Sequence, residues 1–285
     1  MEAAAHRSVV SGAPIAAIVA NDGQPSPGDA AREVAELGST VLRQVWPREP
    51  LAIIRQAIVD FTNAREARLA RGEEGPHERM YSMHGVGTFA ELVAAGFLHE
   101  GILGELFRGS YYHKLCSEYF GDDTFYAAPK RLGYRNHDPL VSGRSFIPYH
   151  QDSYTQDARY PKVLNCWMPL DPGAGVESPG LEVVRNPCRP NFPRKDFGLR
   201  SENAAYDFIT IAREAIAEEY GESFLAPSFE IGDGFVFSEN VIHRTYVTPE
   251  MTKPRINFEF RVFSPKHLGA GATIEDLASI AVKVS

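Results

Sequence analysis

The segment SFIPYHQD places a histidine and a carboxylate two positions apart, at His150 and Asp152. We expect this segment, residues 145–152, to be a β-strand, in which side chains at positions i and i+2 point to the same face. A second histidine, His243, lies 93 residues further on, at the start of another strand-like run. Two histidines and one carboxylate on one face of an iron(II) ion form a facial triad, which leaves coordination positions open for a cosubstrate and for oxygen.

A His-x-Asp pattern by itself does not establish a metal site, because it is common in ordinary surface pairs. Further residues support the site. Arg255 follows His243 by twelve residues, in the run KPRINFEFRVF. An arginine that points into a barrel is a costly buried charge unless it meets an anion, and its planar fork binds a carboxylate through two hydrogen bonds. Thr245 shares a strand face with His243 and can add a hydroxyl donor. Together these residues predict a dicarboxylate bound between the metal and the arginine.

Other cations compete for the role of Arg255. Arg261 has the same strand parity but stands six residues, roughly 20 Å, further along an extended strand, so we expect it to be too distant to share one dicarboxylate. Upstream of the HQD segment, Arg131 and Arg135 share a face by parity. We take Arg131 as the residue of this pair that lines the cosubstrate pocket.

Rival chemistries have weaker support in the sequence. His137 and Asp138 are a second histidine–carboxylate pair, but adjacent strand residues point to opposite faces, so we interpret them as part of a turn that Pro139 favours. No Walker A, HExxH or GxSxG motif is present. The hydrolases that depend on those motifs are therefore disfavoured.

The elements that must position the candidate residues divide the chain into an arm and one domain. Residues 1–27 are rich in Ala, Ser, Gly and Pro and are expected to form a loose N-terminal arm. We expect residues 28–285 to be a single domain, with a helical cover at about 47–120 and a β-barrel core at about 121–265. Many short strands at this spacing indicate a sandwich, a jelly roll or a barrel.

Helical spacing of apolar residues predicts a helix from Pro50 through Phe61 that runs on into a charged tail, a second helical region over 89–120 broken near Gly96 and Gly104, and a helix over about 203–220. The strand-like runs are 39–45, 124–127, 131–135, 145–152, 163–168, 181–184, 228–231, 234–237, 243–247 and 255–263.

Composition limits the class of protein. The chain has 285 residues, a formal net charge of −8 and 44% hydrophobic residues, so it can bury a full core. The acidic balance argues against binding nucleic acid, which needs a positive face. No run approaches the roughly 18 apolar residues that a membrane span requires, and the start of the chain is a poor secretory signal, so we expect a cytoplasmic protein without a membrane partner. Three cysteines without CxxC spacing indicate small buried side chains rather than disulfides or a zinc site.

HQD at 150–152, the GDGFVF segment that leads to His243, Thr245 and Arg255 together resemble the Fe(II)/2-oxoglutarate dioxygenases, specifically the phytanoyl-CoA dioxygenase-like branch. Trp167, in LNCWMPLD, also stands where that branch usually has a tryptophan-bearing strand. The opening GSTVLRQVWPREPLAIIRQAI resembles the initial strand and helix of the branch, so the likeness covers about residues 28–265.

The resemblance implies a mainly β fold with flanking α-helices, a double-stranded β-helix of the jelly-roll or cupin-like kind. It implies that His150, Asp152 and His243 bind Fe(II), and that Arg255, assisted by Thr245, holds the distal carboxylate of the cosubstrate 2-oxoglutarate. We add Trp167 to the cosubstrate pocket. With O2, such an enzyme hydroxylates a small-molecule substrate and releases succinate and CO2. The carboxylate at position 152 argues against the halogenating variants, in which a small residue stands at that position.

The chain departs from this branch after Leu181, where it reads through Val184 into RNPCRPNFPRK. Covering loops that carry substrate choice are expected there, over 185–195, and at 83–88. The substrate candidates are Tyr149, Tyr154, Arg144 and Arg189. Two alternatives stay open: another metal-dependent cupin-type enzyme that does not use 2-oxoglutarate, and an inactive barrel that serves as a binding protein.

Overall fold

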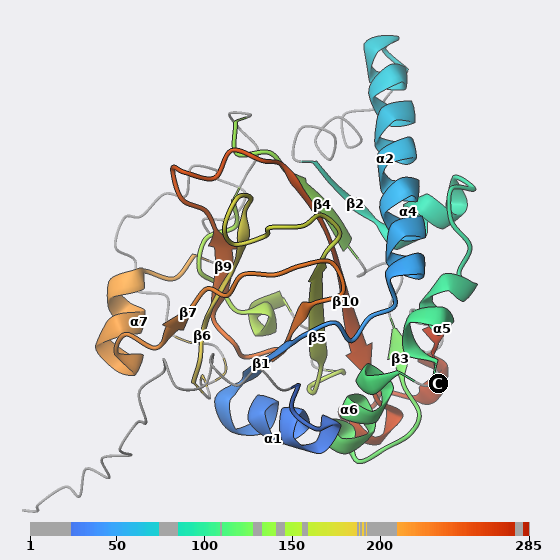
Figure 1. Cartoon of the computed structure of the whole chain (residues 1–285). Helices are drawn as coiled ribbons and strands as arrows, with labels where there is room; N and C mark the ends of the chain where they lie inside the picture. The colour runs from blue at the N-terminus through green and yellow to red at the C-terminus, as the bar shows by residue number, and fades with distance from the viewer. Residues whose placement is uncertain are drawn as a thin grey trace, which may run out of the picture.

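The computed structural model is drawn in Figure 1. It describes residues 24–73, 85–108, 110–127, 133–140, 146–155, 159–186, 188, 190, 192, 210–276 and 282–284. Residues 1–23, most of the expected N-terminal arm, lie outside this part of the chain. Among the described helices, none is long and apolar enough to cross a membrane.

Two antiparallel sheets form the centre of the molecule. The larger sheet has the strand order β1-β8-β5-β10-β3-β11, and β4 joins it by pairing with both β10 and β2. The smaller sheet has the order β7-β6-β9. The larger sheet comprises β1 (Ser39–Leu42), β2 (Val86–Thr88), β3 (Tyr126–Ala127), β4 (Gly133–His137), β5 (Leu164–Pro169), β8 (Gly234–Ser238), β10 (Arg255–Phe263) and β11 (Val282–Lys283). The smaller sheet comprises β6 (Gly180–Val184), β7 (Phe224–Leu225) and β9 (His243–Tyr246).

Helices flank the two sheets, as Figure 1 shows: α2, α4 and α5 lie along the side of β10, and α7 lies beside β7. The helices are α1 (Pro27–Leu37), α2 (Arg48–Ala70), α4 (Phe89–Ala94), α5 (Gly101–Phe107), α6 (Tyr111–Phe120) and α7 (Arg213–Tyr220). Two short 3-10 helices are η2 (Asp152–Thr155) and η4 (Pro265–His267). The predicted mainly β fold with flanking helices is confirmed, and among the described strands the two sheets do not close into a continuous barrel.

Strand β10 separates the apolar core from the interior between the sheets. Its residues of one parity, Ile256, Phe258, Phe260 and Val262, belong to the main hydrophobic cluster. The ring of Phe260 lies 5.4 Å from that of Phe107 on α5, centroid to centroid. Because side chains alternate across a strand, the residues of the other parity point to the opposite face. The four residues of that second set are Arg255, Asn257, Glu259 and Arg261.

Several element boundaries differ from the expected ones. Helix α2 begins at Arg48 and includes the charged segment through Ala70. The break near Gly96 is present, but Gly104 lies inside α5, and the next break follows Phe107. The expected strand at 228–231 is wrong. Its residues form only isolated bridges, because this stretch is held by side-chain and turn contacts rather than by a ladder. The strand β7 was missed, and residues 203–209 of the expected helix over 203–220 lie outside the described residues.

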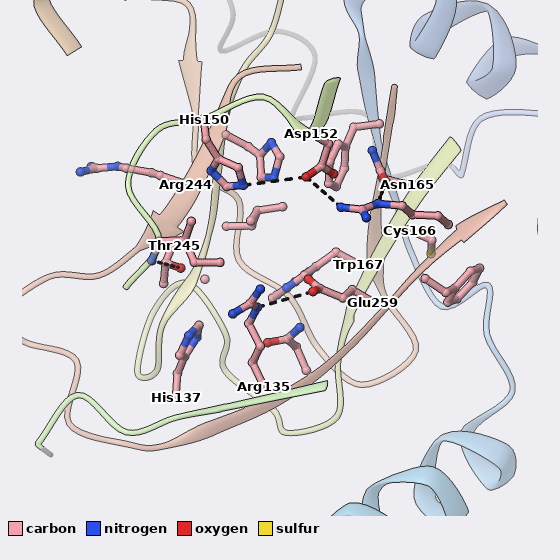
Figure 2. A pocket seen from close by; sticks show the side chains of 18 of the residues that line it. Arg135, His137, His150, Asp152, Asn165, Cys166, Trp167, Arg244, Thr245 and Glu259 are labelled. Atoms are coloured by element: carbon pink, nitrogen blue, oxygen red, sulfur yellow. Dashed lines mark hydrogen bonds and ion pairs between the residues drawn. The ribbon is translucent and has the colours of Figure 1, made fainter. Parts of the chain in front are cut away.

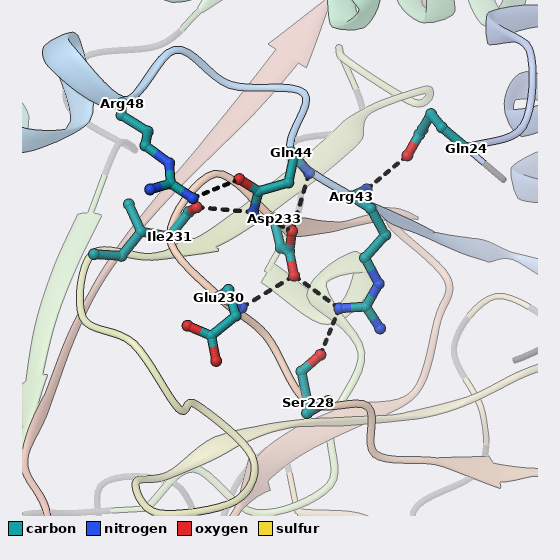
Figure 3. A network of polar contacts seen from close by, with 8 residues as sticks. All are labelled: Gln24, Arg43, Gln44, Arg48, Ser228, Glu230, Ile231 and Asp233. Carbon is teal, nitrogen blue, oxygen red and sulfur yellow. Dashed lines mark hydrogen bonds and ion pairs between the residues drawn. The ribbon is translucent and has the colours of Figure 1, made fainter. Parts of the chain in front are cut away.

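A buried carboxylate ties the connection between β1 and α2 to the turn before β8 (Figure 3). Asp233, 4% exposed, accepts hydrogen bonds from the backbone N–H groups of Gln44 and Glu230, at 2.9 and 3.0 Å. It also forms an ion pair of 2.8 Å with Arg43. Gln44 has a φ of 51°, a left-handed conformation that is unusual for a residue other than glycine. The network around Asp233 compensates for that conformation and fixes the edge of the larger sheet.

Replacing Asp233 with Ala should therefore lower the free energy of unfolding by about 2–4 kcal/mol, because several buried donors lose a charged acceptor at once. Urea unfolding followed by circular dichroism measures the change. As a control, Glu73→Ala breaks an ion pair whose two side chains are about half exposed and should not move the midpoint. Equal midpoints for the two variants would show that the Asp233 network is not structural.

Candidate metal centre

A cavity of about 200 Å³ lies between the two sheets. Its walls come from strands of both sheets and from the segment that contains the HQD motif. Figure 2 shows His150 and Asp152 at one end of the cavity, and His137 and Arg135 at the other. The polar lining residues include Arg135, His137, His150, Asp152, Asn165, His243, Thr245, Arg255, Asn257, Glu259 and Arg261.

The expected strand over 145–152 is wrong, although its two candidate ligands still meet His243. His150 forms a single antiparallel bridge with His243, in which each backbone N–H donates to the other carbonyl at 3.0 Å. Pro148 has no N–H and cannot extend this ladder, and the Thr245 N–H donates to the Ile147 carbonyl instead, at 2.9 Å. After the bridge the chain turns at Asp152 into η2. The pairing of His150 with β9, rather than strand alternation, brings the residues together.

Three side chains are grouped as a metal site would require. One potential ligand atom from each of His150, Asp152 and His243 lies within 4.8 Å of the other two. His150 Nε2 is 3.9 Å from Asp152 Oδ1. The Nδ1 atoms of the two histidines face backbone carbonyls, of Pro148 at 2.8 Å and of Val241 at 3.0 Å. Because a carbonyl only accepts, each Nδ1 carries the proton, and each Nε2 keeps its lone pair for a metal.

Electrostatics favour the metal-binding forms of these side chains. Burial lowers the pKa of His150 to about 3, so this imidazole is neutral at physiological pH. Burial by itself would raise the pKa of Asp152, but the charge and hydrogen bond of Arg261, together with the neighbouring His243 and His150, outweigh it and hold this pKa well below its usual range. A neutral imidazole and an ionised carboxylate are the protonation states that coordinate divalent metals.

Arg255 lies at the other end of the polar face of β10 and is 1% exposed. Its guanidinium donates to neutral acceptors: the Pro179 carbonyl at 2.7 Å, Asn257 Oδ1 at 2.8 Å, and His137 Nδ1. Its Nε has no hydrogen-bond partner among the described residues. Burial lowers the pKa of Arg255 to about 9. A buried guanidinium whose hydrogen-bond acceptors are neutral, and whose Nε–H is unsatisfied among the described residues, is suited to receive an anion.

Two other residues expected in the cosubstrate pocket also line the cavity. Thr245 accepts a hydrogen bond from the Ile147 N–H at 3.2 Å, which leaves the proton of its hydroxyl able to donate. The guanidinium of Arg255 lies over the ring of Trp167, with its Cζ atom 4.9 Å from the ring centroid. Arg131 lies outside the described residues. Arg135, which shares its strand parity, lines the cavity and forms an ion pair with Glu259 at 3.5 Å.

Sequence reasoning misplaced two residues of this cavity. His137 is not in a turn: it is the last residue of β4, is 1% exposed and is paired with Arg255 in the sheet. Its register opposite Arg255 depends on strand pairing, which no local pattern reveals. Arg261 is distant from Arg255, as expected, but it lies beside Asp152, with Nη2 2.9 Å from Oδ1. Arg261 follows Arg255 by six residues, an even number, so both side chains point to the same face of β10. This spacing was the signal in the sequence that both point inward.

The expected substrate residues are less well placed. Tyr149 packs in a separate hydrophobic cluster with residues of α7, and its hydroxyl donates to Glu182 and accepts from Arg213. It does not line the cavity. Arg144, Arg189 and the side chain of Tyr154 lie outside the described residues.

The expected covering loops are described only in part. Within 185–195 the structure describes 185, 186, 188, 190 and 192, and within 83–88 it describes 85–88. The Phe192 N–H donates to Gln151 Oε1 at 2.7 Å, so this point of the loop lies beside the HQD segment. Arg185 instead pairs with Glu33 on α1.

No protein-family model matches this chain, and no curated protein sequence matches it significantly. Solved structures do resemble it. EvdO2 from Micromonospora carbonacea var. aurantiaca, complexed with 2-oxoglutarate, aligns with a TM-score of 0.55 and 17% identity over 83% of this chain and 90% of its own. ThoJ, a non-heme monooxygenase in its apo form, aligns with a TM-score of 0.54 and 11% identity over 90% and 83%. EctD from S. alaskensis, with bound Fe, aligns with a TM-score of 0.53 and 15% identity over 87% and 79%. At these identities the likeness is one of fold, and it confirms the predicted double-stranded β-helix.

If the three grouped residues are the metal ligands, Asp152→Ala and His243→Ala should each weaken Co(II) binding by more than the roughly 10–100-fold that loss of an outer contact costs. Titration of the metal-free protein, followed by visible absorption of Co(II), measures this. His137→Ala is the matched control, because it removes another histidine of the same cavity and should leave the affinity unchanged. An equal loss in that variant would place the metal elsewhere in the cavity.

Proposed function

We propose that this chain is a non-haem Fe(II)/2-oxoglutarate-dependent oxygenase that hydroxylates a small-molecule substrate and releases succinate and CO2. The observation that carries the proposal is one cavity with two complementary ends. His150, Asp152 and His243 can coordinate a metal at one end, and the buried guanidinium of Arg255 lacks a carboxylate partner among the described residues at the other.

The residues fit the iron ion. Both histidines offer Nε2 because their Nδ1 atoms face carbonyls, and Asp152 adds an ionised oxygen. Two neutral nitrogens and one carboxylate match the ligand preference of Fe(II) in this class of site and leave positions open. When bound, the iron would activate O2, which is the oxidant, while 2-oxoglutarate would supply two electrons as it is converted to succinate and CO2. The iron of EctD and the 2-oxoglutarate of EvdO2 are bound by proteins of the same fold.

The residues also fit the cosubstrate. A dicarboxylate that reaches Arg255 satisfies its unpaired Nε and offsets a buried positive charge. Thr245 lies on β9 two positions from His243 and can direct its hydroxyl to the same carboxylate. Trp167 fixes the plane of the guanidinium from below. Leu181 and Phe237 add apolar surface to the lining, which helps to exclude water from the site.

We propose further that the chain is a member of the phytanoyl-CoA dioxygenase-like branch and forms one oxygenase domain over 28–285. The spacing of His150, Asp152, His243, Thr245 and Arg255 supports the branch. Strands from both sheets supply the walls of one cavity, which supports a single domain. Arg131, Arg144, Arg189 and Tyr154 stay predicted members of the cosubstrate and substrate sites.

The activity is tested by succinate formation from 2-oxoglutarate, with Fe(II) and ascorbate, across a panel of metabolites. We expect slow succinate release without substrate and faster release with an accepted one, both abolished by omitting iron. Turnover that needs the metal but not 2-oxoglutarate would indicate the cupin-type alternative instead.

The role of Arg255 is tested by Arg255→Lys. Lysine keeps the charge but loses the planar fork, so the KM for 2-oxoglutarate should rise about tenfold or more, and by more than the KM for the substrate. Arg43→Lys, which alters an ion pair outside the cavity, is the control and should change neither KM. An unaltered KM in Arg255→Lys, together with a raised one in Arg135→Lys, would assign the carboxylate to Arg135.

A further inference from the structure

The position of Asp152 is not determined by a strand. It is the first residue of η2, just beyond the single bridge between His150 and His243. A carboxylate at such a turn has two side-chain torsions that the backbone does not restrict to one value. Its orientation toward His150 therefore depends on what the carboxylate contacts.

Arg261 makes one such contact, an ion pair. Its Nη2 lies 2.9 Å from Asp152 Oδ1, the same oxygen that is 3.9 Å from His150 Nε2. The side chain of Asp152 is 14% exposed, so this ion pair is screened only weakly by water.

The guanidinium is itself held in place. Arg261 Nε donates to Asn165 Oδ1 at 3.0 Å. Asn165 on β5 and Arg261 on β10 are direct partners in the ladder of the larger sheet, so both side chains point into the cavity at the same level. Because a guanidinium is a rigid fork, fixing its Nε also fixes the direction in which Nη2 points.

We propose that Arg261 is a positioning residue for the metal centre: anchored by Asn165, it holds Asp152 beside His150 and His243 before the metal arrives. This inference rests on the proposed function, since it assigns Arg261 to the metal ligands rather than to the cosubstrate. The polar face of β10 then has two separate tasks. Arg255 receives the anion at one end, and Arg261 orients the carboxylate at the other.

Two physical effects follow. Without Arg261, Asp152 loses an ion-pair partner in the cavity wall and can rotate away from the two histidines, which weakens metal binding. A lysine at position 261 keeps a positive charge near Asp152 but cannot contact Asn165 and Asp152 through one rigid group. Arg261→Lys is therefore expected to restore part of the affinity, and not all of it.

The test is Co(II) titration of the metal-free full-length protein, read by visible absorption. Arg261→Gln should weaken Co(II) binding about 10–100-fold, the range found when a partner of a metal ligand is removed. Arg261→Lys should lie between Arg261→Gln and the wild-type protein. Arg43→Gln removes an arginine–aspartate pair of similar length, 2.8 Å, neither member of which lines the cavity, and should bind Co(II) as the wild-type protein does.

A double-mutant cycle with Asp152→Ala separates positioning from a general structural effect. If Arg261 acts through Asp152, adding Arg261→Gln to Asp152→Ala should change the remaining affinity little, whereas an unrelated structural effect adds in full. The same fold-loss in both backgrounds would overturn the inference. Circular dichroism checks folding, and if Arg261→Gln does not fold, the comparison is made with Arg261→Lys.

The outcomes also separate this inference from the proposed function. A wild-type protein that binds Co(II), with Arg261→Gln and Arg261→Lys binding equally well, would refute the positioning role and leave the metal centre intact. A wild-type protein that does not bind Co(II) would refute the metal centre itself. The inference is supported if both variants bind Co(II) more weakly than the wild-type protein, and if Arg261→Gln causes no such loss of affinity in the Asp152→Ala background.

Discussion

Strand β10 imposes the constraint on which the site depends, because its two faces have opposite character. Ile256, Phe258, Phe260 and Val262 pack into the main hydrophobic cluster. The alternating residues, from Arg255 to Arg261, must then enter the space between the sheets, although they are charged or polar. Burial of the aromatic face stabilises the strand enough to bring that polar face inside. The cavity is thus a consequence of how the core is packed.

The charges inside the cavity differ in their partners. Arg261 is paired with Asp152 and Arg135 with Glu259, whereas the guanidinium of Arg255 is bound by carbonyl, amide and imidazole acceptors. An unpaired buried cation is costly, and the cost is recovered when an anion of suitable shape enters. A dicarboxylate bound between the candidate metal ligands and Arg255 would neutralise this buried charge. The electrostatics of the cavity therefore agree with the proposed chemistry.

The smaller sheet contributes the other half of the metal centre. Strand β9 carries His243 and Thr245, and its bridge to His150 is one of the contacts that join the HQD segment to the rest of the fold. Pro148 ends the ladder on one side of His150, and η2 begins at Asp152 on the other. The short length of this pairing explains why Asp152 needs Arg261 to orient it, while the two histidines are oriented by carbonyls of their own segments, those of Pro148 and Val241.

The amino-acid sequence by itself determined the type of fold and the chemical identity of the metal residues. β10 was predicted with its observed bounds, since its alternation is uninterrupted, and the spacing of His150, Asp152 and His243 indicated the triad that the structure groups together. Tertiary structure alone decided that the HQD segment is a bridge and a turn, that His137 faces Arg255, and that Arg261 reaches Asp152. The reason is physical: local pattern sets the face to which a side chain points, whereas strand pairing sets which side chains from distant segments meet there.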